Sequence, residues 1–181
     1  MSTTLDLAPP EAEAVLAFWF GGDPASQNAR WWRKDAAVDA EIARRFGPLL
    51  VRAAGGAFDA WRATERGSLA LVLLLDQLSR NAHRGTPSSF AFDAKAREVA
   101  IGAVDDGFDR ALAVSERTWL YMPLMHSEAL GHQERCVALF AAHVLSLTGE
   151  ARKAAEGSLG FARAHRDIVA RFGRFPHRNE I

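Results

Sequence analysis

Seven apolar residues in a row, Leu69–Leu75, constrain the fold of this 181-residue chain more than any other feature. They lead directly into polar residues, and the whole stretch reads SLALVLLLDQLSRNAHRG. A segment that is apolar on all sides is typical of a helix packed by neighbours all round. A buried strand can carry the same run, but β-branched residues are not enriched and the Asp-Gln-Leu that follows favours a helix. We therefore predict a central, buried helix here.

Helical spacing of apolar residues continues along almost the whole chain, and the alternation typical of half-buried strands is nearly absent. We predict a first helix over 11–20 and a second that is capped by Asp35 and bends or ends at Gly47-Pro48. A further helix is predicted over about 86–107, with Thr86 as its cap, and another from a Ser115 cap to a break at Pro123. The last two run from Pro123 to about 147 and over about 150–172, where Gly173 is the terminator. Short connections favour stacked antiparallel hairpins. The sequence therefore predicts one all-α domain over 1–181, without a visible internal repeat.

Composition narrows the classes of function. Lys plus Arg equals Asp plus Glu, 22 against 22, so no basic excess favours nucleic acid. The longest apolar run is too short to cross a membrane. Cys136 has no partner for an internal disulfide, and the chain does not begin with a leader-like segment, so we expect a cytoplasmic protein. No HExxH motif or cysteine cluster is present, and we predict neither a metal nor a cofactor.

The first polar segment continues the buried helix. Asp76 and Arg80 are four residues apart, as are Gln77 and Asn81, and Arg84 lies four beyond Arg80. Charged residues that emerge from a buried helix either neutralise one another as an internal ion pair or form the floor of a cleft. Both interpretations stay open at this point.

The second polar segment is YMPLMHSEALGHQER. Pro123 lacks an amide hydrogen and disfavours helix just before it, so we predict an irregular backbone, which suits functional positions. His126, Ser127 and Glu128 then supply an imidazole, a hydroxyl and a carboxylate. A general acid–base pair is one interpretation; a hydrogen-bonded core histidine is the commoner one.

The third polar segment closes the chain with RFGRFPHRNEI. A disordered tail has no reason to carry Phe172, Phe175 and Pro176 at such density, so we predict an ordered strap over 173–181. The polar side chains that the strap would hold in a site are Arg174, His177, Arg178 and Asn179.

Other chemically active or aromatic side chains fall on apolar stripes. We interpret Cys136 and His143 as core residues, and we place His165 on the buried side of the last helix. The aromatic group is also assigned to the core; its members are Phe18, Trp19, Phe20, Trp31 and Trp32.

Five motifs occur in a fixed order: VLAFWF, WWRKD, LALVLLLDQLSRNAHRG, YMPLMHSEALGHQ and GRFPHRN. Together they resemble a bacterial family, domain of unknown function 924, over nearly the whole chain. The resemblance implies a fold of tetratricopeptide-like helical hairpins and supplies no activity. It also implies an acidic segment beyond PHRN, so we expect this chain to be a short or shortened member.

Our leading hypothesis is that the three polar segments converge on one cleft. There Arg80, Arg84, Arg174 and Arg178 would recognise a small anionic molecule or a peptide carboxylate.

Three alternatives remain. The first is a hydrolase in which His126 or His177 acts as the base, oriented by Glu128 or Asp76. The second is a protein-interaction module built from stacked hairpins, an inference from fold analogy alone. The third is an Arg/Asp network that only holds helices together.

Overall fold

The computed structural model describes residues 8–180, apart from the side chains of residues 25, 28, 29, 179 and 180. All regular structure in this part of the chain is helical, which confirms the predicted all-α class. The helices group into two compact units, Met1–Ala111 and Leu112–Ile181. Within the described residues, no helix is both long and apolar enough to cross a membrane.

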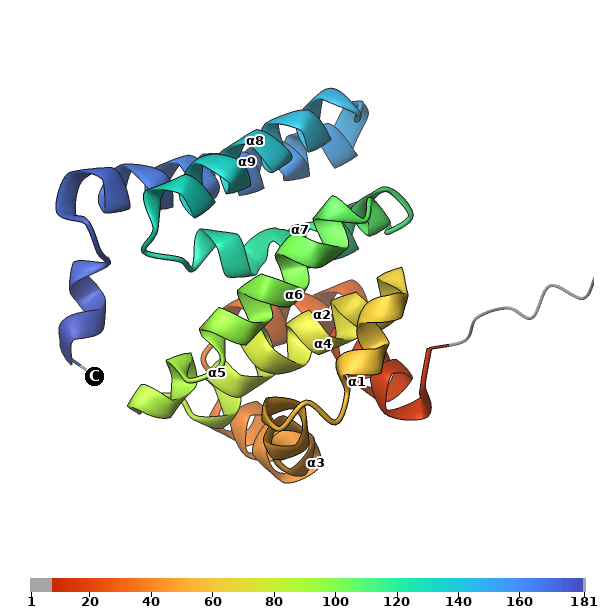
Figure 1. Cartoon of the computed structure of the whole chain (residues 1–181). Helices are drawn as coiled ribbons and strands as arrows, with labels where there is room; N and C mark the ends of the chain where they lie inside the picture. Colours follow the sequence, from red (N-terminus) through yellow and green to blue (C-terminus); the bar gives the residue numbers. More distant parts are fainter. Residues whose placement is uncertain (1–7, 181) are drawn as a thin grey trace, which may run out of the picture. The chain divides into compact units, whose positions relative to one another are not determined.

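The first unit is built around a single buried helix (Figure 1). Its elements are α1 (Pro10–Phe20), α2 (Pro24–Trp32), α3 (Ala36–Ala54), η1 (Asp59–Ala63), α4 (Glu65–Val72), η2 (Leu73–Leu78), α5 (Ser79–Ala82), η3 (Pro87–Phe90), α6 (Asp93–Asp105) and η4 (Phe108–Arg110). The continuous rod formed by α4, η2 and α5, here called the central helix, contacts α1, α3 and α6. Every residue of Leu69–Leu75 is fully buried, as the apolar run predicts.

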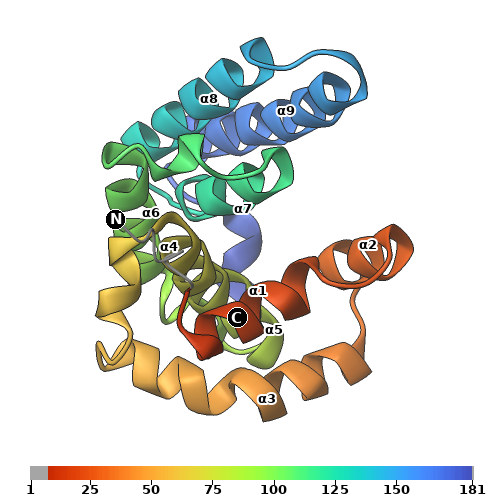
Figure 2. The same cartoon turned by 90° about the vertical axis from the view of Figure 1, so that its right-hand side faces the viewer.

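The second unit is a helical hairpin packed on a third helix. Its elements are α7 (Val114–Met125), α8 (Leu130–Leu145), α9 (Gly149–Phe172) and η5 (Pro176–Glu180). In Figures 1 and 2, α8 and α9 run antiparallel side by side after a short turn, and both contact α7. The largest buried side chains of this unit are Trp119, Phe140 and Phe175.

Two helix ends match the predicted capping residues. Asp35 caps α3 by accepting hydrogen bonds from the amides of Ala37 and Val38 at 2.8 and 3.2 Å. Gly173 ends α9 with a φ of 69°, a left-handed conformation that only glycine adopts without strain.

The two prolines predicted to interrupt helices lie inside them. Pro48 lies within α3. Pro123 lies within α7, which continues to Met125, so the break predicted at Pro123 comes before the observed end of the helix. A proline near a helix end removes few hydrogen bonds, and Pro48 is on an exposed stretch where water can satisfy the freed carbonyl.

Two predicted helix starts are also wrong. The helix assigned a Ser115 cap begins at Val114, and the carboxylate of Glu116 accepts the Ala113 amide at 2.8 Å. Thr86 opens only a short 3-10 turn, and α6 begins separately at Asp93. Short turns of this kind leave little periodicity in a sequence.

Candidate functional site

The central helix changes its hydrogen-bonding pattern where the first polar segment begins. Leu73–Leu78 is a π-helical turn, and the amide of Ser79 bonds to the carbonyl of Leu74, five residues back. The wider turn deprives the Leu75 carbonyl of its usual amide partner, and Ser79 Oγ donates to it at 2.6 Å instead. Turns of this kind are rare and frequently lie at functional positions. This one carries Asp76, whose side chain is fully buried.

Asp76 and Arg80 belong to a network that reaches α6. The Asp76 carboxylate accepts from Gln77 Nε2 at 2.6 Å and from Arg80 Nε at 3.4 Å. Arg80 Nη2 donates to both carboxylate oxygens of Asp93 at 2.8 Å. The guanidinium also lies over the ring of Phe90, 5.1 Å from its centroid. Arg80 therefore lies against two carboxylates and a ring.

Asn81 and Arg84 form a second network, directed at α3. Arg84 donates to the two carboxylate oxygens of Asp39 at 2.6 and 3.0 Å, and Asn81 Nδ2 donates to the same carboxylate at 3.0 Å. The hydrogen bonds that Arg84 donates to Asp39 raise the pKa of Arg84, against the opposing effect of burial. One carboxylate thus fastens α3 to the end of the central helix.

Of the two interpretations of the first polar segment, an internal ion pair and the floor of a cleft, these contacts favour the internal ion pair. Both Arg80 and Arg84 are already neutralised bidentately by a carboxylate, so an incoming anion would have to displace Asp93 or Asp39. A direct role of these arginines in ligand binding stays a prediction.

In the second unit, the link between α7 and α8 is held by side chains of the second polar segment. Ser127 Oγ lies 2.9 Å from His132 Nδ1. The Gln133 amide nitrogen donates to the carbonyls of Met125, at 2.7 Å, and of Ser127. His126 directly follows the last residue of α7. The hydroxyl and the amide of this segment therefore stabilise the link itself.

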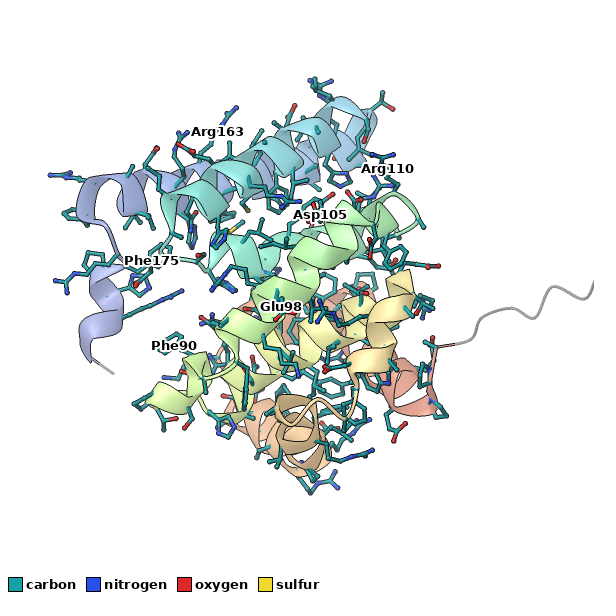
Figure 3. The ribbon with its side chains drawn as sticks, viewed as in Figure 1. Phe90, Glu98, Asp105, Arg110, Arg163 and Phe175 are labelled. Carbon is teal, nitrogen blue, oxygen red and sulfur yellow. The ribbon has the colours of Figure 1, made fainter. Side chains whose placement is uncertain are left out.

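The closing segment lies against that link, with Phe175 as its buried residue (Figure 3). The Phe175 amide donates to Glu128 Oε1 at 2.8 Å, and Arg178 Nη2 donates to the His126 carbonyl at 2.9 Å. The Phe175 ring centroid is 4.5 Å from the Arg178 guanidinium and 5.7 Å from the His177 ring. The second and third polar segments are thus in contact.

His165 of α9 also contacts the closing segment, through the ring of Phe175. Its ring meets Phe175 edge-on at 5.5 Å between centroids, and Nδ1 lies 2.8 Å from the Phe161 carbonyl. Burial lowers the pKa of His165; the hydrogen bond to the carbonyl opposes this, while nearby His126, Arg178 and His177 lower it further.

The predicted residues are therefore divided between the two units. Those of the first segment lie in the first unit, and those of the other two segments lie in the second. Arg174 is exposed, and the Asn179 side chain is outside the described residues. Convergence of all three segments on one cleft stays a prediction, and so do the catalytic roles of His126, Glu128 and His177. Glu128 Oε1 accepts a backbone amide and does not orient a histidine.

A cavity of about 570 Å³ lies elsewhere in the first unit. Its lining comes from the end of α1, from α2, from the α2–α3 connection and from the first half of α3, elements that are seen together in Figure 2. The lining residues that carry charge are Arg30, Arg33, Asp35, Glu41 and Arg45.

Four of these five charges are already engaged. Arg30 donates to carbonyls at the end of α1, including that of Trp19 at 3.2 Å. Asp35 caps α3, and Glu41 pairs with Arg45 at 2.8 Å. Arg33 makes no hydrogen bond or ion pair with any described residue.

The ring of Phe18 forms part of the cavity wall, with two guanidinium groups close to it. Arg30 lies 4.8 Å and Arg45 lies 5.0 Å from the ring centroid. Contacts of this kind hold cationic groups in place beside an apolar surface. Phe18, assigned to the core from sequence, is therefore only partly buried and faces an open space.

Cys136 and His143 are buried, as predicted. Burial raises the pKa of the Cys136 thiol to about 12, so the thiol stays protonated near neutral pH. Across residues 8–180, no three His, Cys, Asp or Glu side chains are grouped so as to hold a metal ion.

Comparison with known proteins agrees with the motif order. The sequence profile of a family described as bacterial protein of unknown function, DUF924, matches residues 15–181. The chain belongs to this family. No curated protein matches it.

A solved structure supports the DUF924 assignment. It is that of a protein of unknown function from Agrobacterium tumefaciens, 39% identical in sequence, with a TM-score of 0.79. The match covers 93% of the present chain and 87% of the other.

The cavity of this DUF924 protein was missed in the sequence because α2 was not predicted. The helix is only nine residues long and follows a Gly-Gly pair. Its start carries a recognisable signal: Asp23 accepts the Ser26 amide at 3.0 Å, and Pro24 occupies the first helical position.

Proposed function

We propose that this DUF924 protein binds a small organic anion in the cavity bounded by α1, α2 and α3. The observation that carries the proposal is the guanidinium of Arg33, which pairs with none of the described side chains and lies on the wall of a cavity of about 570 Å³. Small-molecule sites commonly have volumes of about 300–1,000 Å³, so the space suits a metabolite-sized ligand.

The charge balance of the lining favours an anion. Three arginines face two carboxylates, a difference of one positive charge. Asp35 is bound to backbone amides and Glu41 to Arg45, so neither carboxylate neutralises Arg33. A planar guanidinium binds a carboxylate or a phosphate through two parallel hydrogen bonds.

The uncharged part of the lining indicates what the anionic group is attached to. Ala17, Phe18 and Val38 provide apolar surface beside the arginines. An aliphatic or aromatic acid would place its apolar part against these side chains and its carboxylate near Arg33. This is the small anionic ligand expected from the sequence, at a site formed by other residues.

The test begins with a thermal-shift screen of organic carboxylates and phosphates, followed by calorimetry on the acids that stabilise the protein. Ligands that bind the folded state raise the melting temperature by mass action. We expect Arg33→Ala to weaken binding about ten-fold or more, because one charge-assisted hydrogen bond contributes about 1.5–3 kcal/mol.

Arg44→Ala is the matched control. Arg44 is an exposed arginine of α3 that is not part of the cavity lining, and its loss should leave the affinity unchanged. The proposal fails if no acid raises the melting temperature, or if both variants bind a stabilising acid as the wild type does.

A further inference from the structure

The outer face of α9 carries an apolar stripe that is exposed in the chain. The side of α9 that packs within the unit contributes Ala155, Leu159, Ala162 and Val169. The other side presents residues spaced three or four apart, the spacing of a helix–helix seam: Ala154, Gly157, Phe161, Ala164, Ile168 and Phe172.

Two of these side chains are large and exposed. Phe161 is 64% and Phe172 is 51% exposed. A single exposed apolar residue is ordinary, but two phenylalanines on one stripe form an apolar patch of the kind that interaction surfaces carry.

Two glycines in the middle of α9 have no close neighbour outside their own helix among the residues that the structure describes. At both Gly157 and Gly160, a Cβ would meet no other side chain or backbone within 4 Å. A glycine in a helix interior costs about 1 kcal/mol relative to alanine, so space for a partner outside the chain accounts for both. Small residues of this kind let a second helix approach closely.

The stripe is complementary to an antiparallel copy of itself. If the two-fold axis passes at the level of residue 159, Phe161 of each copy faces Gly157 of the other. The same register places Ala154 against Ala164 of the other copy. Each large side chain then meets a small one, the arrangement that interdigitating helices require.

Charges at the edge of the stripe agree with this register. Lys153 and Asp167 lie on the same flank of α9, with side chains 72% and 66% exposed. In the antiparallel pair, Lys153 of one copy comes within two residues of the position opposite Asp167 of the other, a distance that a lysine side chain spans, and this happens twice by symmetry. Opposite charges on the flanks of such a seam set partner choice and orientation.

We propose that the protein forms a two-fold symmetric dimer through the outer face of α9. The register also brings Phe172 close to the other copy's turn between α8 and α9, which follows Leu145, the last residue of α8, and Leu145 is 77% exposed. A single pair of helices buries less than the roughly 1,600 Å² of a standard interface. The dimer is therefore expected to dissociate on dilution.

Sedimentation velocity of the full chain over a concentration series tests the association. The wild type should shift from monomer to dimer as concentration rises. Phe161→Glu should weaken the dimer about a hundred-fold, because the change acts in both copies at the centre of the seam. Val51→Glu is the matched control, since Val51 is 75% exposed on α3, outside the stripe. Circular dichroism verifies that each variant keeps its helices.

Disulfide trapping tests the register. Gly160→Cys places two thiols beside the two-fold axis and should form a covalent dimer readily. Ala170→Cys, on the exposed opposite side of the same helix, should not. Cys136 is buried and leaves the background low. A wild type that stays monomeric at its highest soluble concentration overturns the proposal, and so does equal trapping of the two cysteine variants.

Discussion

At the scale of the residue, partly buried carboxylates decide where Arg80 and Arg84 of the first unit point. Arg80 and Arg84 come from neighbouring turns, yet one reaches Asp93 at the start of α6 and the other reaches Asp39 on α3. Each guanidinium is held by two hydrogen bonds to one carboxylate, a geometry that fixes both partners. The central helix is thereby fastened to two neighbours.

Asp39→Ala tests how much one of these carboxylates contributes. The change removes the partner of both Arg84 and Asn81 and leaves a partly buried guanidinium unpaired. We expect a loss of about 1–3 kcal/mol in the free energy of unfolding, measured by urea titration. Glu134→Ala, at an exposed position of α8, should stay within about 0.5 kcal/mol of the wild type. Equal losses in the two variants would contradict the assignment.

His165 makes stability depend on pH. Burial keeps its pKa in the folded chain below 6.5, the ordinary value that holds when the chain unfolds. Above that value both states are neutral and the contribution of His165 is complete. As the pH falls, the unfolded state binds the proton more readily, so stability is lost from about pH 6.5 downward through the lowered pKa.

The measurement is urea unfolding at a series of pH values from about 8 to 5, a range that brackets the ordinary histidine pKa. His165→Asn should give a shallower dependence than the wild type over the acidic half of the series. Identical slopes would show that His165 does not cause the effect.

At the scale of the element, the segment after α9 depends on one apolar side chain. Phe175 is 1% exposed, and its amide bonds Glu128. Phe175→Ala should release residues 174–180 from the α7–α8 link, because removing a buried phenylalanine costs about 3–5 kcal/mol. Trypsin should then cut after Arg174 and Arg178 faster than in the wild type, as followed by mass spectrometry.

Phe172→Ala is the matched control for this change. It removes the same side chain three positions earlier, where the ring is about half exposed. Cleavage in this variant should remain close to the wild-type rate. If it accelerates as much as in Phe175→Ala, the buried ring is not what holds the segment.

At the scale of the whole molecule, the apolar pattern along the chain predicted the all-α fold class and the buried central helix, but it did not predict short elements. Leu69–Leu75 is buried as its composition predicts, because such a run has no other stable environment. The short helix α2 was missed, and with it the cavity that contains Arg33. Periodicity needs several turns to be visible, and α2 has too few.

The candidate site was harder to predict because sequence spacing does not show which partner a charge finds. Asp76 and Arg80 were correctly recognised as polar residues of the central helix, and Arg84 lies two residues beyond its end. Their partners Asp93 and Asp39 are 13 and 45 residues away from the arginines that they bind. Only tertiary packing decides whether a guanidinium is neutralised within the chain or left for a ligand.

The π-helical turn of the central helix has a consequence for how relatives of this protein should be aligned. A turn with bonds five residues apart accommodates one residue more than an α-helical turn does. Because the wider turn already absorbs this extra residue, deleting one residue within Leu73–Leu78 would restore an ordinary helix and leave everything after it close to its present orientation. A relative that shows a one-residue gap in this stretch would therefore still direct its counterparts of Arg80 and Arg84 at the same neighbours.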